Sequence, residues 1–228
     1  MAVENCWVIV PAFNEGPVIG EVIAGLRERF AHVVVVDDGS ADDCGAVARS
    51  SGAILLRHPF NLGQGAALQT GIDYAVGRGA SYLATFDSDG QHRVEDIESL
   101  LTALIAEGAD IALGSRFLGS AENMPASRRL LLRAARLFTR LTTGLALTDV
   151  HNGLRVMTRD AAQRIAITHN RMSHASELLE LIASRKLAYI EAPMTVTYTA
   201  YSLAKGQTAW HSVVILSELL MYGLQRKR

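Results

Sequence analysis

The sequence contains no apolar run long enough to cross a membrane, which takes roughly 20 residues. It has only two cysteines among 228 residues, and Cys6 and Cys44 stand in no metal-ligand or redox spacing. No secretory signal opens the chain, because Glu4 and Asn5 interrupt the first apolar residues. These absences predict a reduced, cytoplasmic compartment and a protein that is soluble or peripheral to a membrane.

An excess of basic residues is also absent, because 22 lysines and arginines face 23 acidic residues and the net charge is -1. The chain has no overall positive charge that would neutralise the phosphates of a nucleic acid, so no nucleic-acid partner is expected. A P-loop lysine is missing, which disfavours an ordinary NTPase. The glycine turn NLGQGAAL, residues 61–68, is no dinucleotide fingerprint, because Leu68 stands where a third glycine would be. Its N–H groups, around Gly63 and Gly65, could instead be aimed at an anion.

Short apolar runs alternate with helical patterns over the first half of the chain. We expect strands at residues 6–11, 32–38, 53–58, 81–87 and 109–117, and helices at 17–30, 42–51, 66–78 and 93–107. The second strand, HVVVVDD, is continuous in valine, which is typical of a strand buried on both faces. This order predicts an α/β fold with a mostly parallel, Rossmann-like sheet and helices on both faces.

The alternation stops after Phe117. We expect a polar loop at 120–127, a basic helix at 128–145, a helix at 175–185, a strand at 188–199 and a last helix at 208–226. No linker is long enough to split the chain, whose length is ample for one large domain. The sequence therefore predicts a single domain that ends in an amphipathic, interfacial part.

Polar residues follow four of the expected strands, at Asn14–Glu15, Asp37–Asp38, Asp87–Asp89 and Ser115–Arg116. Ligands of such sheets bind outside the carboxyl ends of the strands, so these clusters predict one shared site. Asp87 and Asp89, in LATFDSDGQH, stand one residue apart. With diphosphate oxygens they would form a hard oxygen shell suited to Mg²⁺ or Mn²⁺. The short D-x-D pattern is also compatible with a solvated turn that Gly90 allows.

The other clusters have two interpretations as well. A carboxylate of Asp37 or Asp38 could accept a hydrogen bond from a nucleobase imide or a ribose hydroxyl. Alternatively, Asp38 or Ser40 could cap the next helix. Asn14 could simply stabilise a turn.

Six motifs, in this order and at these spacings, carry a family resemblance: PAFNE, VVDDGS, NLGQGAALQTG, DSDGQH, GSRF and DVHNGLRV. Together they resemble the family 2 glycosyltransferases with a GT-A fold, and within them the polyprenyl-phosphate sugar transferases of the dolichol-phosphate mannose synthase type. The resemblance covers residues 8–205. It implies an inverting, metal-dependent enzyme that moves a hexose from a UDP- or GDP-sugar to a polyprenyl phosphate at the cytoplasmic membrane face.

The resemblance also implies roles for the matching residues. The donor nucleotide would be held by Pro11, Phe13, Asn14, Glu15, Asp37, Asp38, Gly63, Gly65, Asp87 and Ser88. The Mg²⁺ or Mn²⁺ ion would be bound by Asp87, Asp89 and Gln91. The catalytic set would be Asp89, Arg116, Arg155 and Lys205, whose basic members gather phosphate charge. The sequence departs from the family at Thr199, where an arginine is common. Either Lys205 works with less help, or Arg171 or Arg159 substitutes.

The acceptor decides which further residue the reaction needs. A lipid phosphate is already anionic near neutral pH and needs alignment and cations but no general base. A sugar hydroxyl, in polysaccharide or glycolipid assembly, would demand a base. Glu177 is then the candidate, unless it is an ordinary N-terminal helix glutamate. Arg155 likewise has a second interpretation, which is a structural salt bridge with Asp149.

The expected basic helix bears on membrane binding, and this evidence does not depend on the family resemblance. Residues 127–147 contain five arginines and no acid. Arginines and apolar residues recur there at three- and four-residue steps on two faces: Arg129, Arg133, Arg136 and Arg140, then Leu130, Ala134, Leu137, Phe138, Leu141 and Leu145. The pattern suits an anionic membrane surface, and a helix packed on the sheet with a solvated basic face would show it too. The last expected helix could lie on the bilayer, pack on a membrane-protein partner or form a homodimer contact.

These inferences divide the chain into two functional parts of one domain. Residues 1–120 would be the nucleotide-sugar-binding half with the DxD motif, and residues 121–228 the acceptor-binding and membrane-interfacial part. His92, His151 and His174 are expected to be structural or to support the ligands rather than to bind the metal. A nucleotidyltransferase, which would release pyrophosphate, and a scaffold that has lost catalysis are the two other function classes. The intact acidic pair and glycine turn disfavour the scaffold.

Overall fold

The computed structural model describes residues 5–150, 152–168, 174–199 and 201. Its strands are β1 Cys6–Ala12, β2 His32–Asp37, β3 Ile54–Arg57, β4 Tyr82–Thr85, β5 Ile111–Glu122, β6 Arg155–Thr158 and β7 Tyr189–Thr197. Its helices are α1 Gly16–Arg29, α2 Cys44–Ser50, α3 Gln64–Gly77, α4 Glu95–Glu107, α5 Ala126–Thr143, α6 Arg159–Arg164 and α7 His174–Ser184. The helix expected at 208–226 lies outside the described residues.

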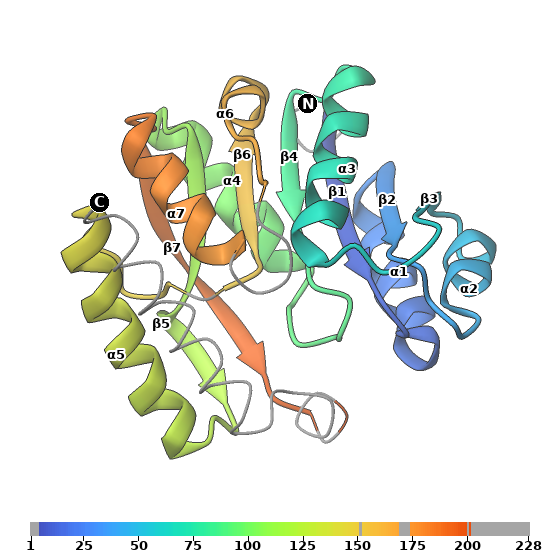
Figure 1. The fold of residues 1–228 in the computed structure, drawn as a ribbon, viewed down its shortest axis with the longest axis horizontal. Helices are drawn as coiled ribbons and strands as arrows, with labels where there is room; N and C mark the ends of the chain where they lie inside the picture. Colours follow the sequence, from blue (N-terminus) through green and yellow to red (C-terminus); the bar gives the residue numbers. More distant parts are fainter. Residues whose placement is uncertain (1–4, 151, 169–173, 200, 202–228) are drawn as a thin grey trace.

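The strands form one seven-stranded sheet in the order β3-β2-β1-β4-β6-β5-β7 (Figure 1). Neighbouring strands are parallel except at β6, which runs antiparallel to both β4 and β5. The predicted α/β fold with a mostly parallel sheet is therefore confirmed. Placing β1 and β4 side by side brings the first and fourth strand ends together in the middle of the sheet.

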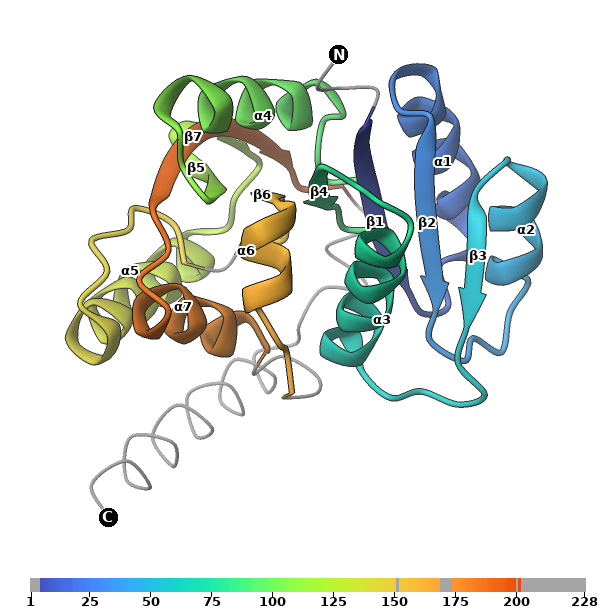
Figure 2. The same cartoon turned by 90° about the horizontal axis from the view of Figure 1, so that it is seen from above.

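Alternating side chains of the central strands face two separate cores. Val8 and Val10 of β1 pack on one side, and Trp7 and Ile9 pack on the other. Helices α1, α2 and α4 cover the first face, and α3, α5, α6 and α7 cover the second (Figure 2). Because both faces are covered, these strands are apolar throughout instead of alternating with polar residues.

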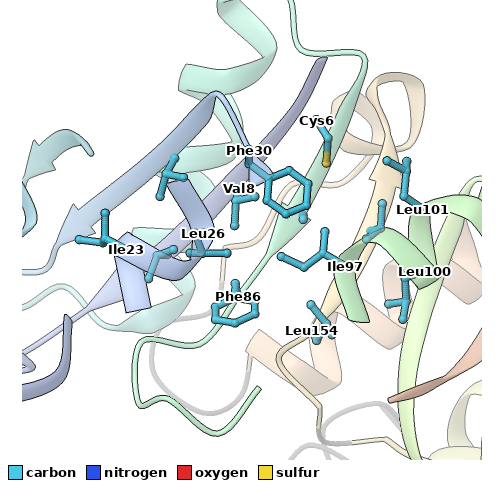
Figure 3. Packing of buried hydrophobic residues seen from close by; sticks show 14 of the residues in the cluster. Cys6, Val8, Ile23, Leu26, Phe30, Phe86, Ile97, Leu100, Leu101 and Leu154 are labelled. Atoms are coloured by element: carbon cyan, nitrogen blue, oxygen red, sulfur yellow. The ribbon is translucent and has the colours of Figure 1, made fainter. Parts of the chain in front are cut away.

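The first core anchors the two segments that carry the site. Phe86, next to Asp87, and Leu154, next to Arg155, are both fully buried in it together with Ile97 and other side chains (Figure 3). Burying a side chain of this size stabilises the fold by roughly 1.5–3 kcal/mol. Polar residues that follow such anchors have little freedom to move away from the sheet.

The prediction of a polar loop at 120–127 is wrong for its first three residues. After an irregularity between Ser115 and Ser120, strand β5 continues to Glu122 and pairs with β7. Gly119 lets the backbone of this segment approach that of Met194 closely. The local sequence is polar because its side chains are largely exposed, and its partner strand lies about 75 residues further along the chain.

Helix α6 was not among the predicted elements. It has only six residues, too few to show a helical apolar period. Its first turn is capped by the side chain of Thr158, which accepts a hydrogen bond from the Ala161 amide at 3.1 Å.

Candidate active site

The predicted polar clusters meet at one edge of the sheet. Strands β1, β2, β4 and β5 run in the same direction, so their carboxyl ends lie on the same side. Strand β6 runs the opposite way, and its first residue, Arg155, pairs with Thr85, the last residue of β4. The antiparallel strand thus adds an arginine beside the Asp87–Asp89 segment.

The segment after β1 connects two neighbouring loops. Asn14 has a positive φ of 54°, and its side-chain oxygen accepts a hydrogen bond from the Ala41 amide at 2.9 Å. Its own amide donates to Ser40 Oγ at 2.9 Å. Asn14 therefore stabilises a turn, which is the alternative to nucleotide binding that the sequence left open. Pro11 is buried within β1, and the Phe13 side chain is 41% exposed. Glu15 is buried and accepts a hydrogen bond from the Tyr201 hydroxyl at 2.8 Å.

Asp38 organises the glycine turn before α3. Its carboxylate accepts hydrogen bonds from the amides of Leu62 and Gly63 at 2.9 and 2.8 Å. His58 Nδ1 lies 2.7 Å from the same carboxylate, and His58 Nε2 lies 3.0 Å from Thr70 Oγ1. Two amides of the turn that were expected to face an external anion therefore bind this internal carboxylate.

Asp37 and the two turn glycines have mainly local roles in the described contacts. Asp37 Oδ1 accepts a hydrogen bond from the Ser40 amide at 2.9 Å, and Arg57 Nε lies 3.3 Å from its other oxygen. Gly63 has a φ of 100°, a conformation that L side chains rarely adopt. Gly65 is buried in the first turn of α3.

The acidic pair after β4 is held by its neighbours. Asp87 Oδ2 lies 3.0 Å from His92 Nε2, and Asp87 Oδ1 accepts a hydrogen bond from Gln64 Nε2 at 3.3 Å. Asp89 Oδ1 accepts from the Gln91 amide at 3.1 Å. The carbonyl of Gln91 in turn accepts from the Thr197 amide at 3.0 Å, which attaches this loop to the end of β7.

The two carboxylates have opposite pKa shifts. Burial alone would raise the pKa of Asp87, but the hydrogen bond and charge of His92, with the charges of Arg155 and His174, outweigh it and lower that pKa. Burial, and next the negative charge of Asp87, raise the pKa of Asp89 to about 6. The negative charge of each carboxylate therefore opposes ionisation of the other.

A divalent cation would fit this pair. Mg²⁺ and Mn²⁺ prefer carboxylate oxygens, and a bound cation would relieve the repulsion between Asp87 and Asp89. The described part of the chain has no group of three or more His, Cys, Asp or Glu residues arranged to hold a metal ion. A metal bound here would therefore complete its shell with other oxygens, such as those of a diphosphate, water or the Gln91 amide.

Arg116 is hydrogen-bonded to two buried residues. Its Nε donates to Asp149 Oδ2 at 2.6 Å, and its Nη1 donates to the Tyr198 hydroxyl at 2.7 Å. Burial opposes its charge, but Asp149 and Tyr198 outweigh that effect and raise its pKa above the ordinary value. Arg116 thus joins β5, the segment before β6 and the residue after β7.

Arg155 is equally buried but has a different environment. Its guanidinium makes no hydrogen bond or ion pair with any described residue, and burial lowers its pKa against the opposing charges of Asp87 and Asp149. The alternative in which Arg155 forms a salt bridge with Asp149 is wrong, because Asp149 pairs with Arg116 instead. A buried cation beside the acidic pair is suited to receive an anion.

Several residues near the site were not predicted. Gln64 contacts Asp87 directly, and its place inside the glycine turn is the signal that could have identified it. Tyr198 and Tyr201 reach back to Arg116 and Glu15 over more than 80 and 180 positions, which no local pattern reveals.

His92 contacts Asp87, which agrees with the expected supporting role. Ser88 is buried between the two aspartates, while Lys205, Arg171 and His151 lie outside the described residues.

Helix α5 exposes two adjacent stripes. Its buried residues are Leu132, Ala135 and Thr139, and Ala135 belongs to the second core. The exposed fractions of Leu130, Leu137 and Leu141 are 70%, 61% and 77%. Arg129, Arg133, Arg136 and Arg140 are exposed beside them, with no acidic partner among the described residues. No helix in the described ranges has the length and apolarity that a bilayer crossing requires.

The chain belongs to glycosyl transferase family 2, which matches residues 7–166. An uncharacterised protein of Methanocaldococcus jannaschii is 37% identical over 96% of this chain and 92% of its own length. The UDP-N-acetylglucosamine–dolichyl-phosphate N-acetylglucosaminyltransferase of Methanococcus voltae is 29% identical over 97% of each chain. The polyprenol monophosphomannose synthase of Mycolicibacterium smegmatis is 29% identical over 87% of this chain and 79% of its own.

The fold is also found in solved glycosyltransferases. Glucosyl-3-phosphoglycerate synthase from Mycobacterium tuberculosis, crystallised with Mn²⁺, UDP and glucosyl-3-phosphoglycerate, superposes with a TM-score of 0.68. The match covers 86% of this chain and 71% of that one at 20% sequence identity. The predicted GT-A-type fold and membership of family 2 are therefore confirmed.

Proposed function

We propose that this protein is a divalent-metal-dependent, inverting glycosyltransferase that moves a hexose from a UDP- or GDP-sugar to a polyprenyl phosphate at the cytoplasmic membrane face. The observation that carries the proposal is the buried Arg155 guanidinium, which has no partner among the described residues and lies within the field of Asp87. A buried cation without an ion-pair partner is costly, so its presence at the strand ends favours an anionic ligand at that position. The activities of the two related transferases from Methanococcus voltae and Mycolicibacterium smegmatis support the same substrate class.

The site residues would act chiefly by electrostatics and alignment. Mg²⁺ or Mn²⁺ held by Asp87 and Asp89 would supply positive charge to the departing nucleoside diphosphate. Arg155 would offer a fixed positive charge where negative charge accumulates, without needing to reorganise, because its side chain is buried. Lys205 would assist from the acceptor side. A phosphate nucleophile aligned opposite the leaving group requires no proton removal.

The position of Glu177 favours a phosphate acceptor over a hydroxyl acceptor. Its carboxylate accepts hydrogen bonds from the Thr168 amide at 2.9 and 3.0 Å and from the Thr168 hydroxyl at 2.5 Å. Glu177 lies in the first turn of α7, where an acid stabilises the helix. A residue that is engaged in this way is a poor general base, so the structure gives a hydroxyl acceptor no support from this residue.

The exposed face of α5 would hold the enzyme on the membrane that contains its acceptor. Leucine and arginine stripes lying side by side suit the boundary between acyl chains and anionic headgroups. Each basic residue near such a surface contributes roughly 1 kcal/mol of attraction. This arrangement would make the protein peripheral and would present the sheet edge to a lipid-borne phosphate.

The test is a panel of radiolabelled UDP- and GDP-hexoses with undecaprenyl phosphate and either Mn²⁺ or Mg²⁺. We expect one donor to give a lipid-linked product that mild acid hydrolyses, and EDTA to abolish its formation. Glycosylation of a soluble saccharide without any lipid-linked product would overturn the choice of acceptor. Release of pyrophosphate from a nucleoside triphosphate would instead identify a nucleotidyltransferase.

A further inference from the structure

The turn between Asn152 and Arg155 lies directly against the carboxylate of Asp87. A Cβ atom built on Gly153 would overlap both oxygens and the carboxyl carbon of Asp87. Gly153 does not have the positive φ that would require a glycine for conformational reasons. The absence of a side chain at this position is therefore needed for space and not for backbone geometry.

The turn itself cannot easily move away from Asp87. Thr85 Oγ1 donates to the Gly153 carbonyl at 2.6 Å, and Asn152 Nδ2 donates to the Gly114 carbonyl at 2.9 Å. The Gly114 amide donates to the Leu154 carbonyl at 3.0 Å. The Leu154 side chain is fully buried in the core beside α4 (Figure 3). Strands β4 and β5 and the core thus fix the turn on three sides.

Asp87 is held from its other sides by Gln64 and His92. Each of them contacts a different oxygen of the carboxylate, at 3.3 and 3.0 Å. A methyl group added at Gly153 would clash with the Asp87 carboxylate. The turn that carries the methyl group is fixed, whereas the carboxylate is held by only two side chains. The carboxylate is the part that would give way, and both of its contacts would be disturbed.

We propose that Gly153 is a positioning residue, which sets the orientation of the Asp87 carboxylate toward a divalent cation together with Gln64 and His92. The inference rests on the proposed function, because it concerns the metal of that reaction. The same turn carries Arg155 two residues later, so it fixes the buried guanidinium relative to the metal-binding carboxylate. The segment from Asn152 to Arg155 is in this view a wall of the metal site as well as the carrier of an arginine.

The test compares Gly153→Ala with Gly77→Ala, which is a matched control because a Cβ at Gly77, the last residue of α3, would meet no atom within 4 Å. The measurement is Mn²⁺ affinity by electron paramagnetic resonance titration, with Mn²⁺ alone and with UDP or GDP. Disturbing the groups that orient a ligand typically weakens metal binding about 10- to 100-fold. We expect a loss of that size for Gly153→Ala, no loss for Gly77→Ala, and similar far-ultraviolet circular dichroism spectra for both.

Gln64→Ala removes a support of Asp87 without adding bulk, and we expect it to weaken Mn²⁺ binding several-fold. Unchanged Mn²⁺ affinity in a folded Gly153→Ala protein would overturn the inference. If Gly153→Ala fails to fold, unchanged affinity in Gln64→Ala would overturn it, and weakened affinity would support it. Failure of the unaltered chain to bind Mn²⁺, with or without nucleotide, would overturn the metal-dependent function itself and the inference with it.

Discussion

Two arginines at the same sheet edge are buried to the same degree and have opposite electrostatic environments. Arg116 is 5% exposed and Arg155 is 4% exposed. Arg116 is paired with Asp149 and Tyr198, and its pKa lies above the ordinary value. Arg155 has no partner among the described residues, and its pKa lies below the ordinary value. The comparison separates a charge that joins parts of the fold from one that is left available for a ligand.

The largest expected effect is on the free energy of unfolding and concerns the paired arginine, Arg116. Arg116→Met would leave the Asp149 carboxylate buried and unpaired, and one of its oxygens already lacks a hydrogen bond. Breaking a buried ion pair in this way costs about 3–5 kcal/mol. Urea unfolding should show a loss of that size. The double variant Arg116→Met/Asp149→Leu should recover much of it, and a loss below about 1 kcal/mol in the single variant would contradict the assigned role.

The unpaired arginine should behave in the opposite way. Arg155→Met removes a buried charge that forms no ion pair with a described residue, so the unfolding temperature should stay the same or rise. Turnover should fall about 10²- to 10³-fold, as it does when a preorganised electrostatic donor is lost. Lipid-linked product formation and thermal unfolding, measured on one preparation, check both expectations. A clear drop in unfolding temperature would show that Arg155 is structural.

Asp89 allows a pH test on the acidic side of the site. The folded pKa of about 6 exceeds that of the unfolded chain, so the folded protein must lose a proton that the unfolded chain lost at lower pH. The stability of the metal-free protein should therefore fall as the pH rises through 6. Asp89→Asn should stabilise the metal-free protein at pH 8 by on the order of 1–3 kcal/mol while abolishing turnover.

The stabilising effect of Asp89→Asn should shrink as the pH falls below 6 and be nearly gone near pH 4. Denaturant unfolding in EDTA at several pH values measures this difference. An effect independent of pH would mean that folding does not raise the pKa of Asp89.

The smallest expected effect concerns the exposed arginines of α5, which form a third class beside the two buried ones. Arg133→Gln should leave stability unchanged and weaken binding to anionic lipid vesicles by roughly 1 kcal/mol, about five-fold. Arg49→Gln on α2 is the matched control, because α2 covers the opposite face of the sheet from α5. Vesicle flotation measures the difference, and equal losses in the two variants would argue against a membrane role for α5.

Local patterns predicted the elements and the strand-end acids well. The valines of β2 and the alternation of short apolar runs with helical segments depend on neighbours in the sequence, and the structure confirms the resulting sheet. The position of Asp87 and Asp89 after β4 follows from the same pattern. The extension of β5 to Glu122 was missed because it depends on pairing with β7.

The roles of individual polar side chains were less predictable. Asp38 was expected to face a nucleotide, and in the described contacts its carboxylate holds the turn around Gly63. Asp149 was considered as a partner of Arg155 and pairs with Arg116. Residue type and spacing indicate which groups reach the edge of a sheet, but they do not indicate which groups bond to each other.

The sequence by itself determined the fold class, the family and the edge of the sheet where charged groups gather, because these depend on local apolar periodicity and on residues that directly follow strands. Only the tertiary structure decided which of two equally buried arginines is neutralised. Arg116 finds its partners 33 and 82 positions away, while the antiparallel β6 places Arg155 beside Asp87 without an ion pair in the described chain. Pairing of buried charges depends on distances set by the whole fold, and no local segment specifies those distances.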